Sequence, residues 1–155
     1  MDRPMRRKDR RLDDAATMDL LRRGEYGILS TTGADGRPYG IPVNYVVQEN
    51  ALYFHCANEG QKIENITANR SVSFCVVGRT EVLPDKFSTR YESVVVSGAA
   101  DLVVEAGLRR RALQALIAKY APDHAEAGEA YIDRLMDQTS VVRVSIDHVA
   151  GKARK

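Results

Sequence analysis

A chain of 155 residues is long enough to bury one hydrophobic core, so we expect a single domain spanning residues 1–155. Hydrophobic residues make up 44% of the chain and charged residues 28%, as in ordinary globular proteins, and no run of 18 apolar residues predicts a membrane span. The basic and apolar pattern of a signal peptide is also missing, and we therefore expect a cytoplasmic protein without a membrane partner.

The net charge of +2 is distributed unevenly. Residues 1–11 contain six basic and two acidic side chains, a local charge of +4, so the remainder of the chain carries −2. A slightly acidic body without an aromatic and basic stripe is not typical of a nucleic-acid-binding protein, and we expect no such partner. We interpret the basic N-terminal arm, at about 1–12, as a solvated segment or as one that crosses to a second subunit.

The N-terminal third predicts a helix and a strand pair. Residues 13–24 form a short helix, with an aspartate to cap its start and a glycine to end it. Residues 26–32 read as a strand, and Asp35-Gly36 predicts a hairpin turn into a second strand over residues 38–47. Pro42 lies inside this second strand and cannot donate to a ladder, which favours an edge or a bulge.

The next segment predicts a strand, a turn and one short helix. Residues 52–57 are rich in aromatic and apolar side chains, and residues 58–60 have turn chemistry. Ile63 and Ile66 then share one helical face, with Lys62 in the first turn. A lysine beside the positive end of a helix dipole is favourable where an anion binds there, although a solvated lysine on an ordinary connection explains the same spacing.

The second half adds strands and two helices. Residues 71–77 predict a strand, and residues 89–105 predict a long one in which Gly98 marks a bend or a close backbone approach. Two helices are expected, over residues 107–120 and 126–136, and residues 140–149 alternate like a half-buried strand with Val142 inward and Val141 outward. Six or seven strands with peripheral helices predict a mainly β protein, a small antiparallel barrel that is closed or split.

The cysteines and histidines do not indicate a metal site. Cys56 and Cys75 lie on separate predicted strands, and the three histidines at 55, 124 and 148 lack ligand spacing. We therefore expect no metal and a reduced chain.

Several motifs resemble one known family when they are taken in order. They are His55-Cys56-Ala57-x-x-Gly60-x-Lys62-Ile63, then Asn69-Arg70-x-Val72-x-Phe74, the preceding Gly36-Arg37-Pro38-Tyr39-x-Ile41-Pro42-Val43-Asn44-Tyr45, and the following Tyr91-Glu92-Ser93-Val94-Val95-Val96-x-Gly98-x-Ala100. This order resembles the pyridoxamine 5'-phosphate oxidase-like split-barrel flavoproteins that bind FMN. The chain ends are similar to the subgroup that includes the Nim-type nitroimidazole reductases.

The resemblance implies a six- to seven-stranded antiparallel split β-barrel that forms a homodimer, with FMN held between two barrels. The residues that it assigns to the cofactor are Pro42, Val43, Asn44, Tyr45, His55, Cys56, Ala57, Gly60, Gln61, Lys62 and Ser93. Lys62 and the amides near Gly60 would hold the phosphate. Similar proteins often have a hydroxyl residue and an arginine where this chain has Gly60 and Gln61, so Arg70, Lys152 or the N-terminal arm would have to assist Lys62.

Two functions follow from the resemblance. The first is an FMN-dependent oxidoreductase that takes electrons from NADH or NADPH and reduces nitroaromatic (nitroimidazole-like) or quinone-like acceptors. No catalytic residue is assigned, because the flavin itself transfers the electrons. The residues that hold the substrate phosphate in vitamin B6 oxidation are not recognisable. The alternative is a non-catalytic binder or sensor of FMN or of another flat ligand, such as a deazaflavin or haem.

Overall fold

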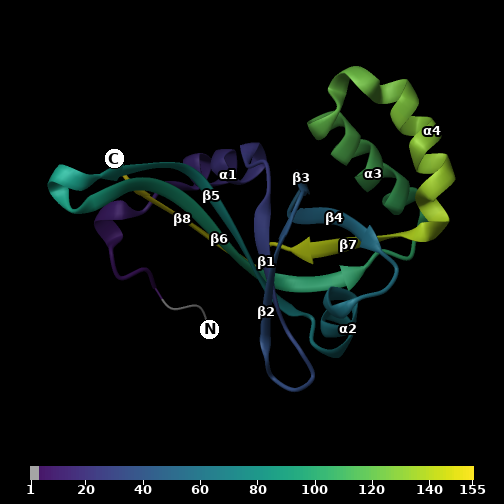
Figure 1. The fold of residues 1–155 in the computed structure, drawn as a ribbon, viewed down its shortest axis with the longest axis horizontal. Coiled ribbons are helices and arrows are strands. Elements are labelled where there is room, and N and C mark those ends of the chain that lie inside the picture. The colour runs from purple at the N-terminus through teal and green to yellow at the C-terminus, as the bar shows by residue number, and fades with distance from the viewer. Residues whose placement is uncertain (1–3) are drawn as a thin grey trace.

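A computed structural model gives the fold of residues 4–155, which consists mainly of antiparallel strands with helices outside them (Figure 1). The strands are β1 (Gly27–Thr32), β2 (Pro38–Val43), β3 (Val46–Gln48), β4 (Ala51–Ala57), β5 (Ser71–Leu83), β6 (Ser88–Leu102), β7 (Thr139–Ser145) and β8 (His148–Arg154). The helices are α1 (Asp14–Arg23), α2 (Gln61–Ala68), α3 (Ala106–Tyr120) and α4 (Ala125–Leu135). Short 3-10 turns are η1 (Lys8–Arg10), η2 (Pro84–Lys86), η3 (Pro122–His124) and η4 (Met136–Gln138).

The strands form one unclosed antiparallel sheet. Their order is β2-β1-β5-β6-β7-β4-β3, and β8 pairs with β6 beside this path. Pro42 therefore lies on an edge strand, as predicted, where its missing amide interrupts no ladder. The mainly β class with peripheral helices is confirmed, with eight strands among the described residues instead of six or seven.

Two predicted strands are each divided in the structure, which accounts for the higher strand count. The predicted strand over 38–47 becomes β2, which pairs with β1, and β3, which pairs with β4. The predicted strand over 140–149 becomes β7 and β8, which pair with different parts of β6. In both places the chain passes from one half of the sheet to the other, so the ladder partner changes while the alternation of side chains in the sequence continues.

The β5–β6 hairpin extends through residues 78–86, where the sequence predicts a strand fragment and a loop without further detail. β5 continues past residue 77 to Leu83, with a register shift between Val77 and Thr80, and the two strands project beyond the sheet (Figure 1, left). The projecting part is paired mainly with itself, so its side chains show no buried face that the sequence could reveal. Before this shift, Gly98 of β6 passes so close to Ser145 that a Cβ atom would overlap the serine carbonyl oxygen. This is the close approach that the sequence predicts.

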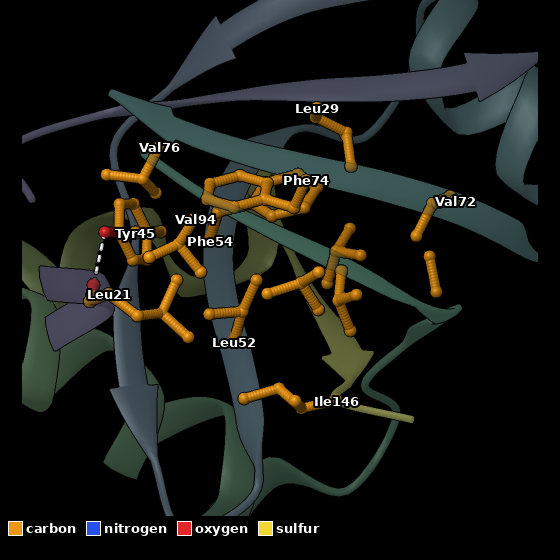
Figure 2. Close-up of a cluster of buried hydrophobic side chains, with 14 of the residues drawn as sticks. Leu21, Leu29, Tyr45, Leu52, Phe54, Val72, Phe74, Val76, Val94 and Ile146 are labelled. Atoms are coloured by element: carbon orange, nitrogen blue, oxygen red, sulfur yellow. Dashed lines mark hydrogen bonds between the residues drawn. The ribbon is translucent and has the colours of Figure 1, made fainter. Parts of the chain in front are cut away.

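The main hydrophobic core lies between the halves of the sheet (Figure 2). The rings of Tyr45 and Phe74 meet edge to face there, with centroids 4.8 Å apart. Burying a side chain of the size of Phe54 contributes about 1.5–3 kcal/mol. A second cluster lies under α3 and includes Tyr53, Leu116 and Val141. The prediction that Val141 points outward to solvent is therefore wrong, because α3 covers that face of β7.

The described part of the N-terminal arm lies along β8. The backbone amide of Leu12 donates a hydrogen bond to the carbonyl of Gly151. Arg11 and Lys152 form an isolated antiparallel β-bridge through their backbones. The predicted arm also includes residues 1–3, which lie outside the described residues. Asp13 caps α1 as expected, accepting a 2.7 Å hydrogen bond from the amide of Ala16. Within residues 4–155, no helix combines the length and apolarity needed to cross a membrane.

Candidate functional site

A cavity of about 520 Å³ lies between the end of β4 and the helical hairpin formed by α3 and α4. This volume is within the range of small-molecule sites. The residues that line it are Asn44, His55, Cys56, Ala57, Leu113, Leu116, Ile117, Tyr120, Ala121, Tyr131, Ile132, Leu135, Gln138 and Thr139. Four of the predicted cofactor residues, Asn44 and 55–57, are thus brought together in one place.

The β4 side of the cavity includes His55 and Cys56. His55, Cys56 and Ala57 form the last three pairs of the β4–β7 ladder, so the sheet fixes their backbone positions. Protein atoms around the ring of His55 desolvate it and lower its pKa, which favours a neutral imidazole at neutral pH. Burial raises the pKa of the Cys56 thiol, and the nearby charge of Lys62 partly opposes this shift. Both side chains are therefore neutral, and the alternation of the strand directs them to opposite faces, with Cys56 packed against the main core.

The start of α2 forms a corner just beyond the end of β4. Gly60 precedes the helix with φ of 118°, a conformation that other residues rarely adopt, and a Cβ atom there would meet nothing within 4 Å. No side chain caps this helix start, and the amides of Gln61 and Lys62 have no acceptor within the helix. Gln61 is exposed and Lys62 is half-buried. The corner offers backbone donors, an ammonium group and open space.

Side-chain hydrogen bonds hold this corner in place. The amide of Asn58 donates 3.1 Å to the carbonyl of Asp137, and its oxygen accepts a 2.7 Å hydrogen bond from the hydroxyl of Ser140. On the other side, buried Asn65 of α2 donates 2.9 Å to the hydroxyl of Thr31 in β1. The corner is therefore attached both to the cavity wall and to the sheet.

Tyr45 is occupied by internal contacts, contrary to the prediction that its backbone faces a ligand. Its side chain is fully buried, and its hydroxyl donates to the carbonyl of Leu21 (Figure 2). Its amide donates 3.0 Å to the hydroxyl of Tyr120, and its carbonyl accepts 2.8 Å from Lys119 Nζ. These contacts of Tyr45 hold the backbone next to Asn44, which is exposed. Among residues 42–45, Asn44 is the one that lines the cavity.

Pro42, Val43 and Ser93 do not line the cavity. Ser93 lies on the outward face of β6, between Val77 of β5 and Lys152 of β8. Val43 is half-buried and packs against the main core. Pro42 shares the outward face with Ser93, at the end of a row of apolar side chains across five strands. That row runs through Pro42, Ile28, Cys75, Val95 and Ala150.

The basic residues expected to assist Lys62 are engaged elsewhere. Arg70 forms a 2.6 Å ion pair with Asp101, and Lys152 lies 5.7 Å from the centre of the Tyr91 ring. Hydrogen bonds from Arg10 and Lys152 lower the pKa of the Tyr91 hydroxyl. The basic arm and β8 therefore form a separate charged region, and Lys62 is a cation whose charge acts on Cys56.

The sequence missed the helical half of the site. The apolar pattern of α3 predicts an amphipathic helix, and the sequence alone assigns none of its residues to the site. In the structure this face both covers β4 and β7 and supplies Leu113, Ile117 and Tyr120 to the cavity. Tyr131 of α4, a large aromatic side chain, remains 51% exposed at the cavity, and this exposure is visible only in the structure. Residues 4–155 contain no group of three or more histidine, cysteine or acidic side chains that could hold a metal.

Comparisons with known proteins agree with this arrangement. Residues 13–153 match the family described as "Pyridoxamine 5'-phosphate oxidase". A curated relative, the 5a,11a-dehydrotetracycline/5a,11a-dehydrooxytetracycline reductase of Streptomyces rimosus subsp. rimosus, is 28% identical over 95 residues. That match covers 59% of this chain, which spans only 64% of the length of the relative.

Solved structures confirm the fold. A structure described as a 5-nitroimidazole antibiotic resistance protein of Bacteroides thetaiotaomicron superposes with a TM-score of 0.80 at 23% identity, covering 92% of this chain and 86% of that one. An FAD-binding protein of Mesorhizobium loti superposes with a TM-score of 0.67 at 25% identity, covering 94% of this chain and 98% of that one. The split-barrel architecture predicted from the sequence is therefore correct.

Proposed function

The chain belongs to the pyridoxamine 5'-phosphate oxidase family, and from this premise we propose that it is an FMN-dependent oxidoreductase. The observation that carries the proposal is the open corner at Gly60, with its uncapped helix start and Lys62, directly beside an apolar cavity. Helix N-termini with free amides bind phosphate, and an ammonium group adds a charge-assisted hydrogen bond.

The residues at this corner fit the phosphate of FMN. Gly60 lacks a Cβ and has open space around it, so a phosphate can approach the amides of Gln61 and Lys62. A single ammonium and two amides suit one phosphate monoester. We therefore propose FMN as the flavin, although FAD is the ligand named for the Mesorhizobium loti relative.

The residues near the ring would control its environment. When bound, the flavin supplies the electron transfer itself. His55 presents a neutral imidazole from the end of β4, Cys56 contributes to the cavity wall there, and Asn44 adds an amide from the opposite connection. Such donors stabilise negative charge that develops at a ring edge, while the apolar walls exclude water.

A second copy of the chain would complete the site. Pro42 and Ser93 lie on the outward face of the sheet, and Val77 and Val95 on the same face are 57% and 43% exposed. An apolar row on an exposed sheet face is typical of an interface. We propose a homodimer in which this face of one subunit covers the corner of the other, so that Ser93 of one copy approaches the ring held by its partner. Pro42 would then lie in the subunit seam.

The acceptor is proposed from the same relatives. A nitroimidazole resistance protein and a reductase of a polycyclic substrate are both similar to this chain, so we propose nitroaromatic or quinone-like acceptors, with NADH or NADPH as the donor. The unpaired Cys56 and Cys75 suit a reducing, cytoplasmic setting. Oxidation of vitamin B6 is not proposed, because the cavity offers no cation for a substrate phosphate.

The test is the spectrum of the purified protein. We expect flavin absorbance that denatured protein releases as FMN, bleaching of this absorbance by NADH or NADPH without oxygen, and recovery when menadione or a nitroimidazole is added. A colourless protein that does not take up FMN would contradict the proposal. Bound flavin that neither donor reduces, and that no acceptor reoxidises after chemical reduction, would instead support the binder or sensor.

A further inference from the structure

We propose that the helical hairpin of α3 and α4 selects the electron acceptor, and that the cavity beneath it takes a flat aromatic molecule without a net charge. The inference rests on the proposed function, because the end of β4 that we assign to the flavin ring also lines this cavity. A molecule in the cavity would therefore lie against the flavin.

The residues that line the cavity are all without a formal charge at neutral pH. None of the fourteen lining residues is lysine, arginine, aspartate or glutamate. A carboxylate or phosphate that entered would lose its water without gaining an ionic partner, and an unpaired charge in an apolar site is strongly disfavoured. A substrate ammonium group would meet the same difficulty. The cavity therefore discriminates against charged molecules of either sign.

The cations near the cavity do not change this conclusion. Arg134 of α4 lies 5.9 Å from the centre of the Tyr131 ring but does not line the cavity, Lys62 is assigned to the flavin phosphate, and the donors of the α3 cations are already used. Arg109 donates to the carbonyls of Met136 and Thr139, the latter at 2.7 Å. Lys119 donates to the carbonyls of Gly24 and Tyr45 at 2.6 Å and 2.8 Å. Both groups lie behind the wall and hold backbone in place, so neither reaches an anion in the cavity.

The walls favour a flat ring. Leu113, Ile117 and Leu135 supply apolar surface from two helices, and the ring of Tyr131 stands half-exposed at the cavity. Polar groups occur at a few places only, such as Gln138 and Thr139, where they can orient one carbonyl, amide or nitro group. An apolar slot with a few placed polar groups is the usual construction of a small-molecule site.

The test uses two ligands of one ring system, of which one is neutral and the other is an anion. 2-Naphthamide and 2-naphthoate have the same ring system and nearly the same shape, and neither accepts electrons under these conditions. Their binding to the flavin-loaded protein is measured by calorimetry at neutral pH, and their inhibition of menadione reduction is measured in parallel. We expect 2-naphthamide to bind at least about 10-fold more tightly than 2-naphthoate.

Substitutions then change the charge of the wall. Leu135→Lys places a cation in the lining and should shift the preference toward 2-naphthoate by about 10-fold or more. Gln138→Lys tests the same point at an exposed lining residue, where folding is not at risk. Ala130→Lys, on an exposed position of α4 outside the lining, is the matched control and should leave the ratio unchanged.

The outcomes separate this inference from the proposed function. Equal binding of the two ligands, no binding of 2-naphthamide, or a ratio that neither lining substitution alters would overturn the inference, even if the protein holds FMN and reduces menadione. Absence of flavin in the same preparation would contradict the proposed function, whereas selective binding of 2-naphthamide that responds to Gln138→Lys would still support the neutral cavity.

Discussion

Lys119 Nζ lies 4.0 Å from the centre of the Tyr45 ring and donates a 2.8 Å hydrogen bond to the carbonyl oxygen of the same tyrosine. This contact joins the end of α3, which forms the cavity wall, to the connection that carries Asn44. Burial of the ammonium lowers its pKa from 10.5 to about 8. The contact between α3 and Tyr45 therefore includes an amine with a pKa of about 8, a pH at which the stability of the protein can be measured.

Stability should depend on pH through this lysine. Between its folded pKa of about 8 and its ordinary value of 10.5, the unfolded chain binds more protons than the folded chain, so the free energy of unfolding should rise with pH. Urea denaturation at about pH 7.5, 8.5 and 9.5 should show that Lys119→Met removes this rise, changing the slope by up to about 1.4 kcal/mol per pH unit. Lys86→Met, at an exposed position of η2, is the control, and parallel curves for Lys119→Met and the native protein would refute the prediction.

Lys62→Ala should weaken FMN binding without affecting riboflavin. Loss of one charge-assisted hydrogen bond to the phosphate is expected to reduce FMN affinity roughly 10- to 100-fold, whereas riboflavin has no phosphate to lose. Fluorescence titration of the two flavins measures both constants. Lys62→Arg should retain most of the affinity, and Lys86→Ala all of it. Equal losses for FMN and riboflavin would mean that Lys62 does not contact the phosphate.

Asn65 and Thr31 should be energetically coupled. Both side chains are buried, and either Asn65→Ala or Thr31→Val leaves a buried polar group without one partner, at a cost of about 1–3 kcal/mol. The double variant should cost less than the sum of the two single variants, because both partners are then removed. Chemical denaturation gives these values, with exposed Ser30→Ala of β1 as the control. Strictly additive losses would show that the hydrogen bond does not attach α2 to the sheet.

Gly98→Ala should be strongly destabilising. The added Cβ would overlap the backbone carbonyl of Ser145, which cannot move without disturbing the Ala51–Ser145 pair of the β4–β7 ladder. We expect a loss of about 3 kcal/mol or more in the free energy of unfolding. The same substitution at Gly40 of β2 meets neighbours only at ordinary distances of 3.6 Å and beyond, and it should be nearly neutral. A Gly98→Ala variant as stable as Gly40→Ala would contradict the close approach.

Val95→Glu should separate the proposed dimer. It places a charge in the middle of the apolar row on the outward sheet face, beside Cys75 and Ala150. Size-exclusion chromatography with light scattering should give a dimer for the native chain and a monomer with little bound flavin for the variant. Val104→Glu, at an 89% exposed position between β6 and α3, should remain dimeric and yellow. A native chain that elutes as a monomer would contradict the two-subunit site.

Local chemistry determined much of the fold. Asp13 and Gly24 bound α1, Asp35-Gly36 forms the first hairpin turn, and Gly60 begins α2, because each of these depends on groups a few residues apart. The order of motifs was sufficient to indicate the split barrel. The placement of Lys62 in the first turn of α2 also follows from the sequence alone.

Only the tertiary structure decided which residues meet. The alternation through residues 38–47 and 140–149 continues across the points where the chain changes ladder partner, so periodicity could not divide these strands. The resemblance assigns Tyr45 to the cofactor, but contacts from Lys119 and Tyr120, more than 70 residues away, occupy its backbone. The cavity combines β4 with two later helices, and Ser93 lies on another face. Such groupings arise from long-range packing, whose partners leave no local pattern in the sequence.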